Sequence, residues 1–129
     1  KAGLAYYAYS SVSSSIGPGP WTVSAGVDPK HKKQAVQLIL DEIDRFTSTP
    51  VSAEEFADSQ SSYIGKLPLA LESNAGVAAA LLNMERYQLG LDFYQRYEEV
   101  IKEVTPQDAF RIAQKYLDPE RLGISSAGP

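Results

Sequence analysis

Two short segments near the N-terminus alternate between apolar and polar or small residues, which is the pattern of a β-strand. The clearer one is Trp21–Val27, where every second residue from Trp21 onward is apolar. The other runs from Leu4 to Val12. Residues 13–20, SSSIGPGP, are rich in Ser, Gly and Pro and predict a turn or an exposed loop. The two strands are therefore expected to form a hairpin.

Apolar residues recur at helical spacing through most of the remaining chain, and this pattern predicts five helices. Their expected bounds are Asp28-Pro29 to about Thr47, Ser52 to about Lys66, Asn74 to about Leu89, a helix marked by Phe93 and Val104, and Thr105 to Leu117. Ser52-Ala53-Glu54-Glu55 is a capping box that opens the second helix. We expect Pro68 to break that helix and Gly90 to end the third.

The final residues, Arg121 to Ala127, predict a short third strand with Leu122 and Ile124 on one face. The expected order is β-β-α-α-α-α-α-β. It indicates an α+β fold with two layers, in which the helices pack on one face of a small antiparallel sheet. Residues 1–129 are interpreted as a single domain fragment, because so narrow a sheet has exposed edges and the chain begins with Lys1 rather than Met.

Composition narrows the classes of function. The 129 residues carry a net charge of −4, and the only basic run is Lys30, Lys32 and Lys33, so we expect no nucleic-acid partner. No apolar run approaches the roughly 18 residues of a membrane span, so no membrane partner is expected. The chain has no cysteine and therefore no thiolate metal site. These properties leave the compartment open, with bacterial cytoplasm and periplasm both compatible.

Two further features have an ordinary structural interpretation beside a functional one. His31 is the only histidine and has no partner with which to act as a base, so we expect a solvated surface residue. The small residues 74–80, NAGVAAA, predict close packing of a helix, and the functional alternative is a smooth wall of a substrate chamber. No metal ligands and no catalytic residues are predicted in this chain.

Three tyrosines, Tyr6, Tyr7 and Tyr9, lie within four positions of the first strand. Neighbouring side chains on a strand point to opposite faces, so Tyr6 and Tyr7 are not both expected in the core. Tyr7 and Tyr9 share a face, and we assign them to packing on the helix side. Tyr6 is then expected on the helix-free face, together with Leu4, Ala8 and Ser10.

Several segments together resemble the second domain of the pitrilysin/insulinase-like zinc metallopeptidases, in the bacterial processing-protease branch. They are GLAYYAYSS at 3–11, the strand 21–27 leading into Asp28-Pro29, VSAEEF at 51–56, LALES at 69–73, RYQLGLD at 86–92, VTPQD at 104–108 and YLDPERL at 116–122. The resemblance extends over essentially the whole chain.

The resemblance implies a pair of similar domains that enclose a chamber, with the zinc held by the first domain. In the second domain, an Arg and a Tyr seven residues apart hold a substrate carbonyl near the zinc site. Tyr6 matches that tyrosine, and the arginine would fall two positions before Lys1. The implied partners are the first domain of the same protein, a peptide substrate and a second family subunit, in a homo- or heterodimer. The zinc is expected in the parent protein and not in these residues.

The sequence therefore predicts a non-catalytic C-terminal domain of a zinc-dependent processing protease, in which Tyr6 helps to bind substrate. Three alternatives stay open. The parent protein is a catalytically inactive relative with a structural role, or it is a helper subunit that completes the site of a partner. The last alternative is an α+β binding module unrelated to peptidases, which a Tyr6 buried among the helices would favour.

Overall fold

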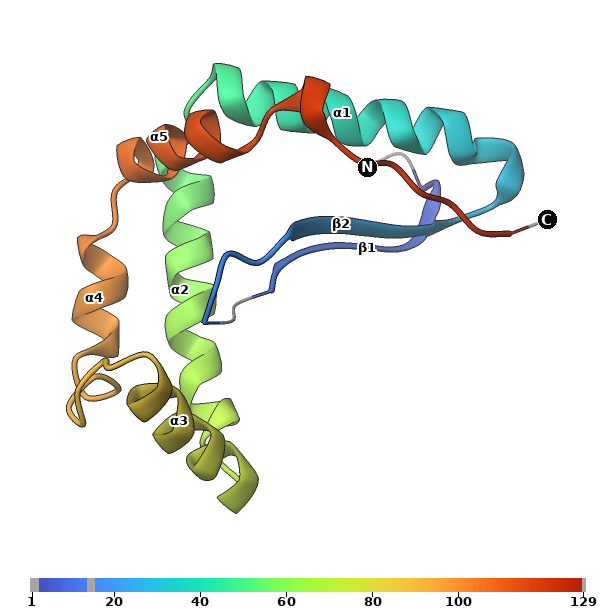
Figure 1. Cartoon of the computed structure of the whole chain (residues 1–129). Helices are drawn as coiled ribbons and strands as arrows, with labels where there is room; N and C mark the ends of the chain where they lie inside the picture. The colour runs from blue at the N-terminus through green and yellow to red at the C-terminus, as the bar shows by residue number, and fades with distance from the viewer. Residues whose placement is uncertain (1–2, 14–15, 129) are drawn as a thin grey trace. The chain divides into compact units, whose positions relative to one another are not determined.

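The computed structural model describes residues 3–13 and 16–128, which form two compact units (Figure 1). Unit 1 comprises residues 1–49 and 113–129, and unit 2 comprises residues 50–112. The elements are β1 (Ala5–Val12), β2 (Trp21–Val27), the 3-10 helix η1 (Pro29–His31), α1 (Lys32–Ser48), α2 (Ala53–Ala70), α3 (Asn74–Arg86), α4 (Tyr97–Glu103), α5 (Pro106–Tyr116) and the 3-10 helix η2 (Pro119–Arg121). The predicted α+β class is confirmed.

Unit 1 is built on the hairpin and on α1. β1 and β2 pair in antiparallel fashion, as predicted, and α1 contacts β2 (Figure 1). Ile43 on α1 is buried at 5% exposure. The predicted start at Asp28-Pro29 is confirmed in a modified form, because the Asp28 carboxylate accepts the Lys30 N–H at 3.0 Å and the first turn is the tighter helix η1.

The predicted third strand is absent from the described residues, whose sheet has only the strands β1 and β2. Residues 122–126 instead lie beside β2 and α1, where they line a cavity of about 370 Å³. The alternation predicts Leu122 and Ile124 on one face of a strand, and in the structure Ile124 is 61% exposed. A strand needs ladder hydrogen bonds as well as an alternating pattern, and this segment makes none with β2.

In unit 2, α2 and α4 pack together. The Gln60 side-chain amide on α2 donates to the carbonyls of Ile101 at 2.7 Å and Val104 at 3.1 Å, at the C-terminal end of α4. Those carbonyls would otherwise lack partners inside the helix. This side chain therefore ties the end of α4 to the middle of α2.

The α2 helix continues past Pro68, so the prediction that Pro68 breaks it is wrong. Proline removes one N–H from the ladder, but the Leu71 N–H still donates to the Leu67 carbonyl at 3.1 Å. Pro68 lies in the last turn of α2, so the loss of one backbone hydrogen bond there leaves the residues on either side helical.

The α3 helix ends at Arg86, before the predicted end near Leu89. Gln88 adopts a positive φ of 53°, and the Leu89 N–H donates to the Met84 carbonyl at 3.0 Å. This six-to-one bond after a left-handed residue defines a Schellman motif. Gln88 therefore takes the role expected of Gly90. The next helix is also shorter than predicted, because α4 begins only at Tyr97.

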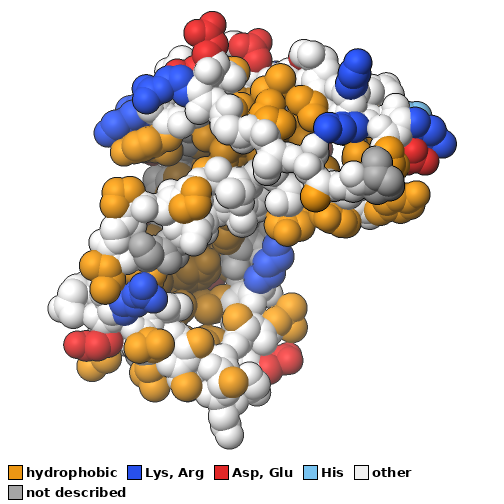
Figure 2. Space-filling view, turned by 45° about the vertical axis from the view of Figure 1, so that its right-hand side comes forward, with side chains coloured by type: hydrophobic (Ala, Val, Ile, Leu, Met, Phe, Trp, Pro, Cys, Tyr) orange, Lys and Arg blue, Asp and Glu red, His pale blue; other side chains and the backbone are white. Residues whose placement is uncertain are grey.

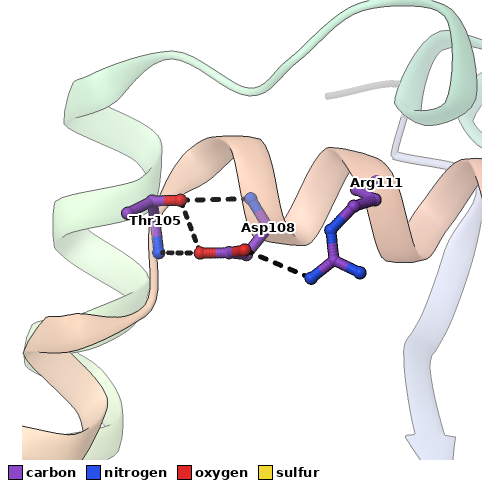
Figure 3. Close-up of polar contacts among 3 residues, drawn as sticks. All are labelled: Thr105, Asp108 and Arg111. Atoms are coloured by element: carbon purple, nitrogen blue, oxygen red, sulfur yellow. Dashed lines mark hydrogen bonds and ion pairs between the residues drawn. The ribbon is translucent and has the colours of Figure 1, made fainter.

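The α5 helix starts with a reciprocal cap between Thr105 and Asp108 (Figure 3). The Thr105 hydroxyl accepts the Asp108 N–H at 3.1 Å, and the Asp108 carboxylate accepts the Thr105 N–H at 3.2 Å. Arg111 adds an ion pair to the same carboxylate. The hydrogen bonds from Thr105, assisted by Arg111, lower the pKa of Asp108.

Many apolar side chains reach the surface of this chain (Figure 2). Among the described residues, the buried hydrophobic ones are Ile43, Ala80, Met84 and Ala113. The same residues contain no helix that combines the length and the apolar character needed to cross a membrane. Each unit therefore has only a small core, so single packing contacts and helix caps are a large share of its stability.

Replacement of Thr105 by Ala should lower the free energy of unfolding by about 1 kcal/mol, because α5 loses its N-terminal cap. Urea titration followed by circular dichroism measures this change, and Thr105→Ser, which keeps the hydroxyl, is the control. Asp108 has a lowered pKa in the folded state, so its stabilising contribution is complete above the unfolded pKa and is lost as pH falls through the folded pKa. The difference between wild type and Thr105→Ala should shrink in acid. An equal loss of unfolding free energy in Thr105→Ala and Thr105→Ser would contradict the role of the Thr105 hydroxyl as a cap.

Gly76→Ala should destabilise unit 2, because a Cβ at Gly76 would lie 1.8 Å from the Ala70 carbonyl oxygen. Backbone must move to admit the methyl group, at a cost of about 1 to 3 kcal/mol. Gly65→Ala is the matched control, since nothing lies within 4 Å of the added Cβ on α2. That variant should gain about 0.5 to 1 kcal/mol through helix propensity. Thermal unfolding of both variants should show shifts of opposite sign, and shifts of the same sign would refute the close approach.

Candidate functional site

Tyr6 occupies an irregular position in the hairpin. Ala5 pairs with Val27 and Tyr7 pairs with Gly26, so β1 has one residue more than β2 between these two pairs. Tyr6 is that extra residue, and it has no opposite residue on β2. Such a β-bulge interrupts the ladder and re-aims the side chain of the residue it inserts. The side chain of Tyr6 is 84% exposed.

The register also decides which side of the sheet faces α1. Ser10 pairs with Val23, and both line a cavity of about 530 Å³ together with residues of α1. Opposite residues of an antiparallel pair share a face. Ala8, which pairs with Ala25, therefore also lies on the face toward α1. The prediction that Ala8 and Ser10 lie on the helix-free face is wrong.

Tyr7 and Tyr9 lie on the other face, opposite Gly26 and Ser24. Their exposures are 56% and 59%, so the prediction that they pack on the helix side is also wrong. That assignment relied on the packing preference of tyrosine. The apolar alternation of β2 is the signal that would have corrected it, because Trp21 and Val23 mark the inward face. Val12 pairs with Trp21 and shares that face, so Tyr7 and Tyr9 lie on the opposite, outward face.

We call the outward surface of the hairpin the tyrosine face. It comprises Tyr7, Tyr9, Ser11, Thr22, Ser24 and Gly26. The rings of Tyr7 and Tyr9 are stacked, with centroids 6.0 Å apart and planes inclined by 29°. The Tyr7 ring covers Gly26 so closely that a Cβ there would lie 2.4 Å from Cε1. The side chains of Ser11 and Thr22 are hydrogen-bonded at 3.1 Å, and the face contains no charged residue.

The position of Tyr6 follows from the bulge and its exposure rather than from alternation. Because the bulge lies at Tyr6, the alternation of faces along the rest of β1 does not determine where the Tyr6 side chain points. Tyr6 is highly exposed and therefore not buried among the helices. Burial there would have favoured a binding module unrelated to peptidases. A phenol on a bulged, exposed position is free to donate one hydrogen bond to a ligand.

The other candidates have structural surroundings. His31 ends η1 and is half-buried rather than fully solvated. Within residues 3–13 and 16–128, no group of three or more His, Cys, Asp or Glu side chains is placed to hold a metal ion. In the segment 74–80, Gly76 approaches the end of α2 and Ala80 is 8% exposed, which supports close packing at these two positions. Ala75, Ala78 and Ala79 remain exposed.

Comparison with known families identifies one match. Residues 1–63 match the family model described as the peptidase M16 inactive domain. No curated protein matches the chain. The matched segment contains both strands, Tyr6, α1 and the first part of α2, whereas the resembling motifs from Leu69 onward lie beyond it. Residues 1–63, just under half of the chain, are therefore similar to the inactive domain of the M16 peptidases.

Proposed function

We propose that this chain is the non-catalytic, substrate-binding part of the second domain of a zinc-dependent processing peptidase. In this proposal, Tyr6 donates a hydrogen bond from its phenol to a backbone carbonyl of a bound peptide. The observation that carries it is the bulge, which leaves Tyr6 without a cross-strand partner and 84% exposed, within the segment that matches the family.

The chemistry of a phenol suits this task. It donates one hydrogen bond without bringing a charge, so it fixes a peptide carbonyl and polarises it with little cost in desolvation. The adjacent strand carries no charge either, since β1 reads AYYAYSSV and β2 reads WTVSAGV. Such a surface accepts the neutral backbone of a peptide more readily than a charged group. Hydrolysis itself is assigned to the first domain of the parent protein, which would supply the zinc and the general base.

The partners belong to the same proposal. The chain would pair with the first domain of its own protein, bind a peptide substrate, and associate with a second family subunit. Support for the first of these is the family itself, whose description marks this domain as the inactive one of a peptidase. An inactive domain acts on peptides only together with a domain that carries the catalytic groups.

Tyr6→Phe should weaken binding of an unstructured peptide to this chain, because it removes one hydroxyl and keeps the ring. A neutral hydrogen bond contributes about 0.5 to 1.5 kcal/mol, so the dissociation constant should rise roughly 2- to 12-fold. Fluorescence anisotropy with a labelled peptide measures the change, and Tyr116→Phe, at a tyrosine that is 66% exposed outside the hairpin, is the control. In the full-length peptidase, the same change should reduce turnover while zinc content and stability stay constant. Wild-type binding and turnover in Tyr6→Phe would rule the role out.

The chain alone should bind no zinc stoichiometrically, because its described residues offer no ligand group and it has no cysteine. Dialysis against zinc followed by metal analysis checks this, with His31→Ala as a comparison for weak surface binding. One zinc retained per chain, lost in His31→Ala, would contradict the assignment of the metal to another domain.

A further inference from the structure

We infer that residues 90–104 form a strap that detaches from α2 as one unit while α3 and α5 stay folded, with Gln60 as its latch. The strap comprises the turns before α4 and the helix α4 itself, and α4 lies beside α2 within unit 2 (Figure 1). Local opening occurs where a segment has few ties to its surroundings and where the elements on either side are stable without it. The inference is independent of the role proposed for Tyr6, which lies in unit 1.

The strap is held together by contacts within itself. Arg96 forms an ion pair with Asp92 at 2.6 Å. The rings of Phe93, Tyr94 and Tyr97 contact one another, with centroids 5.2 to 6.1 Å apart. However, α4 has only seven residues, and helices shorter than about 12 residues are marginal on their own in water. The helix of the strap therefore depends on its contact with α2.

That contact involves one face of α2. The Gln60 amide donates to the carbonyls of Ile101 and Val104, at 2.7 and 3.1 Å. Tyr63 lies three residues further along α2 and therefore on the same face. Burial raises the pKa of the Tyr97 phenol, and so does the phenol of Tyr63 beside it. Because both contacts come from one face of α2, loss of the Gln60 hydrogen bonds should loosen the whole strap.

The helices on either side of the strap have caps that do not use it. At the end of α3, the Leu89 N–H donates to the Met84 carbonyl at 3.0 Å. At the start of α5, Thr105 and Asp108 cap each other. Detachment of residues 90–104 breaks neither cap, so α3 and α5 can remain folded when the strap opens.

The backbone at the two ends of the strap can absorb the movement. Gly90 has a positive φ of 88°, and Val104 is extended with φ −68° and ψ 132°. Hinges are typically a few residues at the ends of stable elements. A Cβ at Gly90 would lie 2.9 Å from Oδ1 of Asp92, and left-handed backbone disfavours any side chain. The docked position of the strap therefore favours glycine at this hinge.

Native-state hydrogen exchange of the whole chain, at increasing low concentrations of urea, tests the strap without any substitution. The amides of residues 100–103 in α4 should share one opening free energy and one small urea dependence, both below those of amides in α3 and α5. Equal opening free energies in α3, α4 and α5 would overturn the inference, because residues 90–104 would then open only together with the rest of unit 2.

One substitution at the latch and one at the hinge should act on the same amides. Gln60→Met, which keeps a similar shape but has no donor, should raise the exchange of residues 100–103 roughly 5- to 150-fold, as expected for two lost hydrogen bonds. Gly90→Ala should raise it roughly 5- to 30-fold, because alanine disfavours the left-handed backbone. In both variants, amides in the middle of α3 and α5 should change by less than about twofold.

Gln114→Met is the matched control, because the Gln114 amide donates to the Thr47 carbonyl at 3.3 Å within unit 1. This variant should leave the exchange of residues 100–103 unchanged. If Gln60→Met accelerates exchange in α3 and α5 as much as in α4, the strap is not a separate unit and the inference is wrong. An effect of Gly90→Ala that is confined to the turn before α4 would overturn it as well.

Discussion

The register of β1 against β2, with one extra residue at Tyr6, determines which side chains lie on each face of the hairpin. From Val12 opposite Trp21 down to Tyr7 opposite Gly26, the two strands pair one to one. At Tyr6 the ladder skips a residue, which frees that side chain from the alternation that governs its neighbours. The same register turns the apolar side of β2 toward α1 and leaves the uncharged tyrosine face outward. A one-residue slip would exchange these faces completely.

Features that depend on local chemistry were predictable from the sequence. The bounds of β2 follow from strict alternation, and Ser52 caps α2 by accepting the Glu55 N–H at 3.1 Å, as the capping box indicated. Asp28-Pro29 likewise opens the first helical segment. In each case the residues that carry the signal also make the contact, so no information about distant parts of the chain is needed.

Features that depend on pairing between segments were not predictable in this way. Strand alternation indicates which residues of β1 share a face, but only the register with β2 determines which face is covered. The bulge at Tyr6 has no sequence signal of its own. Residues 122–126 alternate like a strand but lack a ladder. At the end of α3, Gln88 adopts the left-handed conformation that favours glycine, because the Schellman bonds to Glu85 and Met84 compensate its cost.

The contact between Tyr7 and Gly26 makes the two positions interdependent during sequence change. A side chain at position 26 is compatible with the hairpin only if residue 7 has no ring there or turns its ring away. Conversely, a ring at position 7 can lie against β2 only where residue 26 has no side chain. Substitutions at the two sites should therefore be non-additive, and a double replacement that moves bulk from one strand to the other should be tolerated better than either single one. Relatives of this domain would then be expected to exchange the two residues as a pair.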